Sequence, residues 1–426
     1  MDFANVDVVV AGGGPAGIGA AVAAARAGAK TMLLERHGFL GGVGAHGMGM
    51  NINQMRPGGQ PRSTIHDMVV DQVLSYGPEA GNLVDHALIC NVEYLKVALL
   101  DVLDSLGCDF LVHTRVVDAV VRSDRIHQVV VATKQGLARI GAKVFVDATG
   151  DADLAYFAGA ETMKGREGDG FLSPMTLCFI ITHVDVDAVR AFAESDEDCR
   201  KLIERARGKY PMLPPTIIFE RGPFPLRNSL VINHAGTKLR GVLDATDPRE
   251  MTEAEDYSRR QILQIVAALR EFGGPAFAHV QLAAAGANVG VRETRRVRGL
   301  YVLTEEDAMA GRRFDDAVAW RSGYLDIGFV RWEPMHIHDV PYRALVPEKL
   351  DGLLVAGRCV SATHVGASSG KSMGNCMATG HAAGRAAALC AERDCLPRDL
   401  NVSDLQQALS ADGVDLKRES DWDNRP

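Results

Sequence analysis

A pattern of three glycines between two apolar runs constrains this chain more than any other feature. Residues 6–10 are mostly valine, which is typical of a strand buried in a parallel sheet. Gly12, Gly14 and Gly17 follow in the spacing G-x-G-x-x-G, and the Ala-rich stretch 18–27 behind them predicts a helix. A second apolar run comes next, so this part of the chain predicts one βαβ unit.

Each glycine of this pattern has a physical role in holding a pyrophosphate. Gly12 permits a tight turn, Gly14 lets the backbone approach a phosphate, and Gly17 lets helix and strand pack closely. The helix N-terminus presents free N–H groups and the positive end of its dipole. The second apolar run, 31–34, ends at Glu35, whose carboxylate can accept hydrogen bonds from ribose hydroxyls. The segment therefore predicts a site for an ADP-ribose-type moiety. The alternative is a glycine-rich turn that holds no ligand.

The composition is that of an ordinary globular protein. Of 426 residues, 47% are hydrophobic and 23% are charged, and this length allows two or more packed units. The formal net charge of −8 argues against a nucleic-acid partner and against an anionic membrane surface. The apolar stretch 171–184 contains a proline and is too short to span a bilayer, and no signal peptide precedes the first predicted strand. We therefore expect a cytoplasmic protein.

The eight cysteines follow no metal-binding or redox spacing. No C-x-x-C occurs, and the spacings match neither a zinc nor an iron–sulfur pattern. We expect no metal site and eight reduced thiols, with a redox-active dithiol as the alternative. The cysteines are Cys90, Cys108, Cys178, Cys199, Cys359, Cys376, Cys390 and Cys395.

Beyond the first unit, the sequence alternates between helical and strand patterns. The glycine-rich segment 37–51 predicts a loop, because so many glycines disfavour a stable helix or strand. Such a loop can lie flat against a ligand. The other elements expected before residue 153 are helices at 62–75 and 92–106 and strands at 110–121, 126–133 and 138–146.

The pattern changes at Leu154, where strands and helices mix without another glycine fingerprint. The elements expected there are strands at 175–184 and 230–233, helices at 187–207 and 253–272, and a proline-rich connector at 210–225. A buried strand that ends at Gly357 and a small-residue helix at 374–389 then follow. We therefore divide the chain into 1–153, an inserted substrate domain at 154–289, 290–400, and a C-terminal helix with a frayed tail at 401–426.

Three separated segments resemble a known class of proteins. Residues 8–36, 147–151 and 353–384 occur in this order in FAD-dependent two-domain flavoproteins of the glutathione-reductase-like class. More narrowly, the chain resembles the FAD-dependent oxidoreductase family related to the flavin subunit of heterodisulfide reductase. The residues that carry the narrower resemblance are Glu35-Arg36 with Gly41-Gly42, the run GVRETRR at 290–296, 301–304, 337–345, and 356–384. It covers roughly residues 5–395.

The resemblance implies an α/β fold. A Rossmann-like FAD-binding domain would combine a parallel sheet with a small β-meander, and an inserted α+β domain would face the substrate. It also implies non-covalent FAD and an oxidoreductase activity, without naming a substrate. The segment 357–384 would have no role in a simple nicotinamide dehydrogenase, so we expect FAD rather than NAD as the resident cofactor. Only one full fingerprint is present, so we expect no second dinucleotide domain.

The resemblance also assigns positions around the cofactor. The loop at Gly41-Gly42 would run along the pyrophosphate, and the backbone of Val116 would meet the adenine. Asn375 and Cys376 would face the flavin N1–C2=O edge, where the helix dipole stabilises reduced anionic flavin. Together with the fingerprint, the expected cofactor contacts are Gly12, Gly14, Pro15, Ala16, Gly17, Glu35, Arg36, Gly41, Gly42, Val43, Gly47, Met48, Val116, Ala148, Thr149, Gly150, Gly357, Arg358, Gly374, Asn375 and Cys376.

Four residues are candidates for chemistry or for substrate binding. His46 lies in the loop expected near the flavin, His364 precedes the last helix, and His338 precedes a predicted strand. Each could serve as a proton acceptor or donor, although such histidines are more often structural. The four arginines Arg292, Arg295, Arg296 and Arg298 would pair with Glu293 and other carboxylates on a solvated face; the alternative is that one of them, first of all Arg292, anchors an anionic substrate. Cys359 and Cys376 could react, or could simply be small buried groups.

The expected function is hydride transfer between flavin N5 and a small organic substrate. The alternatives are an electron-transfer flavoprotein subunit that serves a partner enzyme, and a non-redox isomerase or synthase that uses flavin as a scaffold. The expected partners are a small-molecule substrate and an external electron acceptor or donor. A homo-oligomer is compatible with the sequence, and neither nucleic acid nor a membrane is expected.

Overall fold

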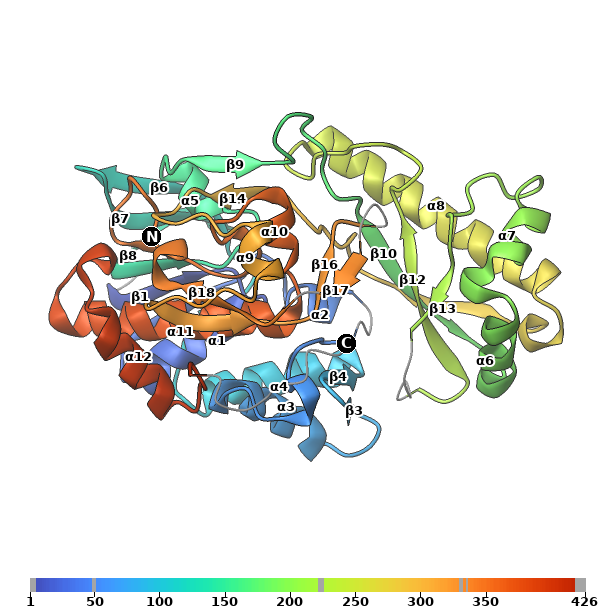
Figure 1. Cartoon of the computed structure of the whole chain (residues 1–426), viewed down its shortest axis with the longest axis horizontal. Coiled ribbons are helices and arrows are strands. Elements are labelled where there is room, and N and C mark those ends of the chain that lie inside the picture. The colour runs from blue at the N-terminus through green and yellow to red at the C-terminus, as the bar shows by residue number, and fades with distance from the viewer. Residues whose placement is uncertain (1–4, 48–50, 221–225, 329–331, 335, 418–426) are drawn as a thin grey trace.

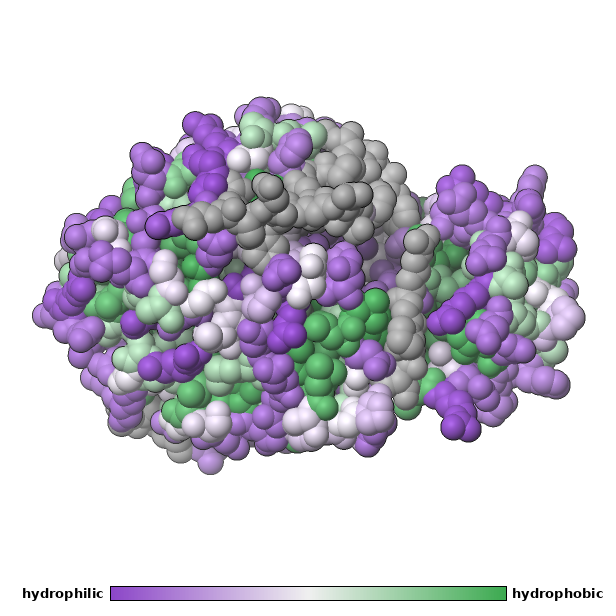
Figure 2. Space-filling view, turned by 60° about the horizontal axis from the view of Figure 1, so that its bottom comes forward, coloured by the Kyte–Doolittle hydropathy of each residue, from purple (hydrophilic) through white to green (hydrophobic). Residues whose placement is uncertain are grey.

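The computed structural model describes residues 5–47, 51–220, 226–328, 332–334 and 336–417. It has two lobes of unequal size (Figure 1). The larger lobe contains both ends of the described chain, and the smaller lobe contains residues from the middle. Figure 2 shows polar and charged side chains over most of one face, with smaller groups of apolar side chains between them.

The larger lobe is built on a seven-stranded sheet. Its order is β5 (Asp109–Leu111), β2 (Thr31–Leu34), β1 (Val6–Ala11), β8 (Gly136–Asp147), β7 (Arg125–Thr133) and β6 (Arg115–Arg122), with β19 (Leu353–Val355) also paired to β8. Strands β5, β2, β1, β8 and β19 are parallel, whereas β6, β7 and β8 form an antiparallel meander. The long strand β8 joins both parts, since residues 142–147 pair with β1 and residues 136–141 pair with β7. The predicted α/β class is confirmed.

Two helices rich in small residues cross beside this sheet, so closely that their backbones are in contact. They are α1 (Pro15–Arg26) and α11 (Met373–Arg393). A Cβ atom on Gly380 would lie 2.0 Å from the carbonyl oxygen of Ala16, and one on Gly384 would lie 2.1 Å from that of Ala20. Any side chain at these glycines would push the helices apart. This contact explains why both predicted helices are rich in glycine and alanine.

The smaller lobe holds a four-stranded antiparallel sheet and its own hydrophobic core. The strand order is β11 (Ile218–Phe219), β12 (Ser229–Gly236), β10 (Thr176–Thr182) and β13 (Gln281–Ala285). The helices of this lobe are α6 (Val186–Ser195), α7 (Arg200–Ala206) and the long α8 (Pro248–Phe272). Its core runs from Met175 to Val289, while Leu154 and Ala160 are buried in the core of the larger lobe.

The remaining elements surround the main sheet and connect the lobes. The helices are α3 (Thr64–Ser75), α4 (Val92–Asp104), α5 (Asp153–Phe157), α9 (Glu305–Met309), α10 (His364–Ser368) and α12 (Val402–Ala411). The short strands are β3 (Gly81–Val84), β4 (Ala87–Cys90), β9 (Thr162–Lys164), β14 (Arg295–Val297), β15 (Ala317–Arg321), β16 (Tyr324–Asp326), β17 (Trp332–Pro334) and β18 (His338–Pro341). Over the residues described, no helix combines the length and apolar character that crossing a membrane requires.

Three expected elements are corrected. The loop at 37–51 contains one helical turn, α2 (Val43–His46), which packs against α4. The helix expected at 187–207 is two helices, because the Asp196 carboxylate accepts hydrogen bonds from the backbone N–H groups of Lys201 and Leu202 and so starts a new helix. The strand expected at 110–121 is also two strands, with a left-handed residue at His113 between them.

Candidate functional site

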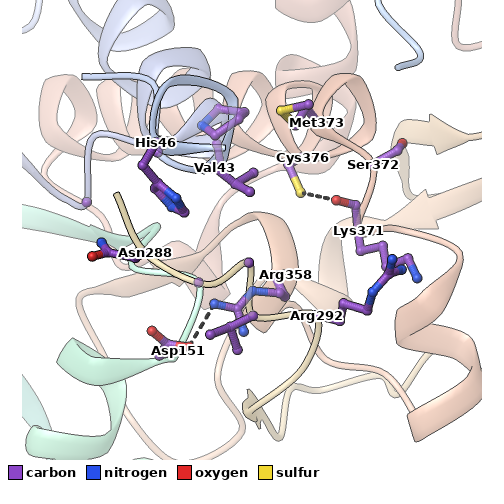
Figure 3. Close-up of a pocket in the computed structure, with 18 of the residues that line it drawn as sticks. Val43, His46, Asp151, Asn288, Arg292, Arg358, Lys371, Ser372, Met373 and Cys376 are labelled. Atoms are coloured by element: carbon purple, nitrogen blue, oxygen red, sulfur yellow. Dashed lines mark hydrogen bonds and ion pairs between the residues drawn. The ribbon is translucent and has the colours of Figure 1, made fainter. Parts of the chain in front are cut away.

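One cavity of about 1090 Å³ extends from the glycine pattern to the smaller lobe. Its walls include residues of the fingerprint, the start of α11, the start of α8 and the strands β10 and β12. A cavity of this size is at the upper end of the range for small-molecule and cofactor sites. Ten of its lining residues are labelled in Figure 3.

The three fingerprint glycines have distinct geometries. Gly12 has φ +100°, and a Cβ there would lie 2.6 Å from the carbonyl oxygen of Ala148. A Cβ on Gly17 would lie 1.7 Å from the oxygen of Gly12, so helix and strand are in close contact. Gly14 lines the cavity, and its nearest neighbour would be 3.8 Å from an added Cβ. Gly14 is also the N-cap residue of α1, which has no side-chain cap and no acid in its first turn. This helix end is therefore open to an anion.

Glu35 ties the glycine turn to the end of β2. Its carboxylate accepts hydrogen bonds from the backbone N–H groups of Gly13, at 2.7 Å, and His37, at 2.8 Å. Only 5% of the residue is exposed, and it lines the cavity beside Arg36 and Arg115. Within the described part of the chain no ion pair joins Glu35 to Arg36. Each carboxylate oxygen can accept more than one hydrogen bond, so Glu35 retains capacity for a hydroxyl.

The N-terminus of α11 forms a second helix end on the same cavity. Ser372, Met373 and Cys376 line the wall there, and the first turn has no acidic residue. Burial raises the pKa of the Cys376 thiol to about 11, and its sulfur lies 3.3 Å from the carbonyl oxygen of Gly370. Burial likewise raises the pKa of Cys359 well above its ordinary value. Both groups are therefore thiols at neutral pH, which argues against a nucleophilic role.

His46 is the predicted histidine that reaches the cavity wall. It lies at the end of α2, on the opposite side of the pocket from Lys371 and Arg292 (Figure 3). Burial, and next the nearby His37, lower the pKa of His46 to about 4, so its imidazole is neutral at physiological pH. Its Nδ1 is buried without a hydrogen-bond partner among the described residues. A neutral imidazole of this kind can accept a proton.

Arg292, Asp326 and Lys371 form an ionic cluster on the cavity wall. Nη1 of Arg292 lies 2.7 Å from Oδ2 of Asp326, and Nζ of Lys371 lies 2.6 Å from the same oxygen. Asp326 and Lys371 were not predicted as site residues. The available signal was the position of Lys371, which lies directly before the helix expected to face the flavin.

The other arginines of the run 290–298 have structural partners. Arg295 pairs with Asp153, Arg296 with the buried Glu293, and Arg298 with Glu161 and Glu348. The predicted pairing with carboxylates is thus observed, but the expected solvated face is wrong for Arg296, whose side chain is only 3% exposed, and holds for Arg298, which is 45% exposed. Arg292 is the member of the group that lines the cavity.

Two predicted catalytic histidines lie away from the cavity wall, which corrects those expectations. His364 is buried and its Nδ1 lies 2.8 Å from the Glu293 carboxylate, inside the Arg296 network. His338 is buried behind Ser369, with its Nε2 3.3 Å from the Ser369 hydroxyl. Ser369 itself lines the cavity, so His338 acts at most through that hydroxyl.

Some of the expected cofactor contacts line the cavity and others do not. Lining the cavity are Gly12, Gly14, Pro15, Ala16, Glu35, Arg36, Gly42, Val43, Ala148, Thr149, Gly150, Arg358 and Cys376. Gly17, Gly41, Gly47, Val116, Gly357, Gly374 and Asn375 do not line it, and Met48 lies outside the described residues.

Contacts within the protein explain why two of these positions, Gly374 and Asn375, do not line the cavity. A Cβ on Gly374 would lie 1.9 Å from the Gln54 oxygen, so this glycine serves backbone contact. The amide of Asn375 donates to the carbonyl oxygens of Ser322 and Ser369 and therefore points into the protein, not towards the cavity.

These residues fit a dinucleotide such as FAD. Two uncapped helix ends, a glycine turn that leaves room at Gly14, and the Glu35 carboxylate line one continuous cavity. Arg358 adds a partly buried cation, held 2.7 Å from the Asp151 carboxylate. The donor groups suit phosphates, and the acceptor suits ribose hydroxyls.

Comparison with known proteins agrees with this fit. The model of the family described as FAD dependent oxidoreductase matches residues 7–409. Curated relatives include thiamine thiazole synthases from Methanococcus vannielii (34% identical over 164 residues, 35% of this chain and 58% of that protein) and Methanococcus maripaludis (34% over 177 residues, 37% and 60%). The chain thus spans less than two thirds of the length of these relatives.

Solved structures share the fold at low identity. An aromatic hydroxylase from angucycline biosynthesis has a TM-score of 0.52 and 13% identity, with 96% of this chain and 66% of that chain covered. A flavin-dependent brominase has a TM-score of 0.50 and 11% identity, with 96% and 83% covered. The family match over nearly the whole chain is the decisive finding. The protein belongs to the FAD dependent oxidoreductase family, and its cofactor is FAD.

Proposed function

We propose that this flavoprotein oxidises or reduces a small organic molecule by hydride transfer in the cavity between its two lobes. One observation carries the proposal: residues of the dinucleotide-binding turn and residues of the smaller lobe line the same cavity. From the smaller lobe these include Thr176, Asn233, Met251, Thr252 and Glu255. A space bounded in this way accommodates both the cofactor and a reactant.

The side chains of this cavity supply the groups that hydride transfer requires. FAD supplies the two-electron redox chemistry when bound. His46 holds a neutral imidazole at the wall and would take the proton that an alcohol or amine loses as it is oxidised, or return it in the opposite direction. The open N-terminus of α11 places positive dipole charge on the same wall, where negative charge on a bound group is stabilised.

The test is an anaerobic screen of small metabolites with the purified yellow protein. The expected result is that one chemical class bleaches the flavin and that oxygen or a quinone restores the colour. A His46→Ala variant should bind FAD normally and bleach slowly with the same compound. Rapid stoichiometric bleaching by NADH or NADPH alone would contradict a protein with one dinucleotide site.

A second candidate is a flavin-dependent synthase without net redox change. The partial similarity to thiamine thiazole synthases is the observation that favours it. In that case no metabolite would bleach the flavin, and a product would form with the cofactor still oxidised. The electron-transfer alternative predicts instead that the protein is inert alone and is bleached or reoxidised only with a partner protein.

A further inference from the structure

The ionic cluster on the cavity wall joins three parts of the chain that are far apart in sequence. Arg292 follows the last strand of the smaller lobe, Asp326 ends β16, and Lys371 precedes α11. Both cations contact the same oxygen, Oδ2 of Asp326, at 2.7 and 2.6 Å. Nζ of Lys371 also donates to the backbone oxygen of Asp326. The side chains are between 16% and 21% exposed, and that remaining exposure faces the cavity.

This cluster has more positive than negative charge. Two cations share one carboxylate, so one positive charge is left over. Burial, and next the charge of Arg292, lower the pKa of Lys371 to about 8. Burial raises the pKa of Asp326, but Arg292 and Lys371 outweigh it and hold that pKa well below its ordinary value.

The neighbouring charges do not remove this excess. Burial, and next Arg292, lower the pKa of Lys238 to about 6, and the pKa of His234 is lowered by burial and by Lys238. Two acids lie near the cluster: Glu293, which acts on Lys371 but is itself paired with Arg296 and His364, and Glu220, whose pKa is raised by burial. Its carboxylate accepts hydrogen bonds from Asn51, at 3.2 Å, and Asn233, at 3.0 Å. Both lysines would gain from a further anion, because each has its cationic form disfavoured by burial and by Arg292.

The cluster also has hydrogen-bonding capacity left for a ligand. Nε of Arg292 is buried without a hydrogen-bond partner among the described residues. The hydroxyl-bearing Thr176 and Tyr324 and the amide of Asn233 line the same cavity. The planar guanidinium matches the geometry of a carboxylate, an adjacent ammonium adds a second donor, and a single excess charge suits a monoanion.

We propose that Arg292 and Lys371 bind a carboxylate of the substrate, and that Asp326 holds the two cations in place while competing with that carboxylate. This inference rests on the proposed function, since it assigns a substrate class to the same cavity. The reactant is then a small organic monocarboxylate whose acid group lies at the Arg292–Lys371 side. His46 lies across the pocket from that group (Figure 3). The Arg292–Lys371 side of the cavity therefore selects substrates by charge.

Binding of simple probes to the FAD-loaded protein tests the proposal. The probes are benzoate and its neutral isostere benzamide, and binding is followed by the change in the flavin absorption spectrum and by the melting temperature. We expect benzoate to bind and benzamide to bind much more weakly. Lys371→Gln and Arg292→Gln should each weaken benzoate binding by about ten- to a hundredfold and leave the affinity for benzamide unchanged. Lys371→Arg, which keeps the charge, should retain most of the benzoate affinity.

Asp326→Asn provides the decisive variant because it should act in the opposite direction. Removing the competing carboxylate should tighten benzoate binding by up to about tenfold and lower the melting temperature, and saturating benzoate should restore that temperature. A merely structural ion cluster predicts that all three neutral variants lose stability and that benzoate restores none of them.

The outcomes separate this inference from the proposed function. Equal affinity for benzoate and benzamide in a yellow protein overturns only the inference. Inorganic phosphate that displaces benzoate at lower concentration overturns the assignment of a carboxylate. A folded protein that takes up no FAD overturns both. Should Arg292→Gln fail to fold, the opposite signs expected of Lys371→Gln and Asp326→Asn still decide the question.

Discussion

The two ends of the cavity are built in different ways. At the nucleotide end, the cavity wall includes the backbone of Gly12 and Gly14 from one continuous segment, with the Glu35 carboxylate close by in sequence. At the opposite end, the groups are charged side chains of Arg292, Asp326 and Lys371, which come from separate segments. Backbone groups suit the cofactor, which is the same in every member of a flavoprotein family. Side chains can be substituted individually, which suits a substrate that differs from one member to the next. The contrast suggests that the two ends respond differently to substitution.

The largest effect is expected at Gly17, at the nucleotide end. A Cβ at this position would lie 1.7 Å from the carbonyl oxygen of Gly12, and backbone atoms cannot rotate away. Gly17→Ala should therefore cost more than about 3 kcal/mol of stability and give little folded protein, as measured by chemical denaturation.

Gly14→Ala is the matched control. Its Cβ has no neighbour closer than 3.8 Å and would project into the cavity, so the fold should survive with a loss of about 1 kcal/mol while FAD retention falls. Equal stability of the two variants would contradict the separate roles of these glycines.

The next largest effect is expected at His46, on the substrate side. His46→Ala should slow flavin reduction in single-turnover experiments by about a hundred- to ten-thousandfold, because a proton acceptor is lost. The base form of His46 predominates above its pKa of about 4, so the rate of substrate oxidation should fall as the pH falls through about 4.

A surface histidine gives the control for this experiment. His127 is exposed on β7, and His127→Ala should leave the rate unchanged. A rate in the parent protein that drops near pH 6.5, the ordinary value for histidine, would show that His46 is not the group that titrates.

Glu35 should affect the cofactor and not the substrate. Its carboxylate can form charge-assisted hydrogen bonds with the ribose hydroxyls, each worth roughly 1.5–3 kcal/mol. Glu35→Ala should therefore weaken FAD binding by about one to four orders of magnitude, measured as the FAD dissociation constant.

FMN lacks the adenosine and separates two routes to this result. Unchanged FMN binding would mean that Glu35 acts on the ribose. Weaker binding of FMN as well would mean that losing the hydrogen bonds from Gly13 and His37 disturbs the glycine turn. Unchanged FAD binding would remove Glu35 from the cofactor site.

The smallest effect is expected at Arg298, which lies outside both ends. Its ion pairs with Glu161 and Glu348 are about half exposed, at 3.6 and 3.4 Å, so Arg298→Gln should change the free energy of unfolding by less than about 1 kcal/mol. The buried neighbour Arg296, paired with Glu293, provides the comparison, since Arg296→Gln should cost about 3–5 kcal/mol. Similar losses in denaturant titrations of the two variants would contradict this difference.

Local patterns in the sequence determined much of the nucleotide end. The order strand, glycine turn, helix, strand and acid is contiguous, and each residue type follows from a short-range requirement such as a positive φ at Gly12. The same local logic found the Ala-rich helices α1 and α11, although their mutual contact through Gly380 and Gly384 was not foreseen. Local reasoning was wrong in the segment 37–51, where packing against α4 stabilises the turn α2 despite its glycines.

The end of the cavity that holds Arg292, Asp326 and Lys371 was decided by the tertiary structure. Nothing in the sequence near Asp326 or Lys371 indicates that either will meet Arg292, because their proximity depends on how the smaller lobe joins the larger one. For the same reason His46 and His364 were equal candidates in the sequence, yet folding placed one at the cavity wall and the other beside Glu293. Backbone φ angles and helix starts depend on a few neighbouring residues, so the sequence indicates them directly. The assembly of charges from distant segments depends on long-range packing, which only the folded chain defines.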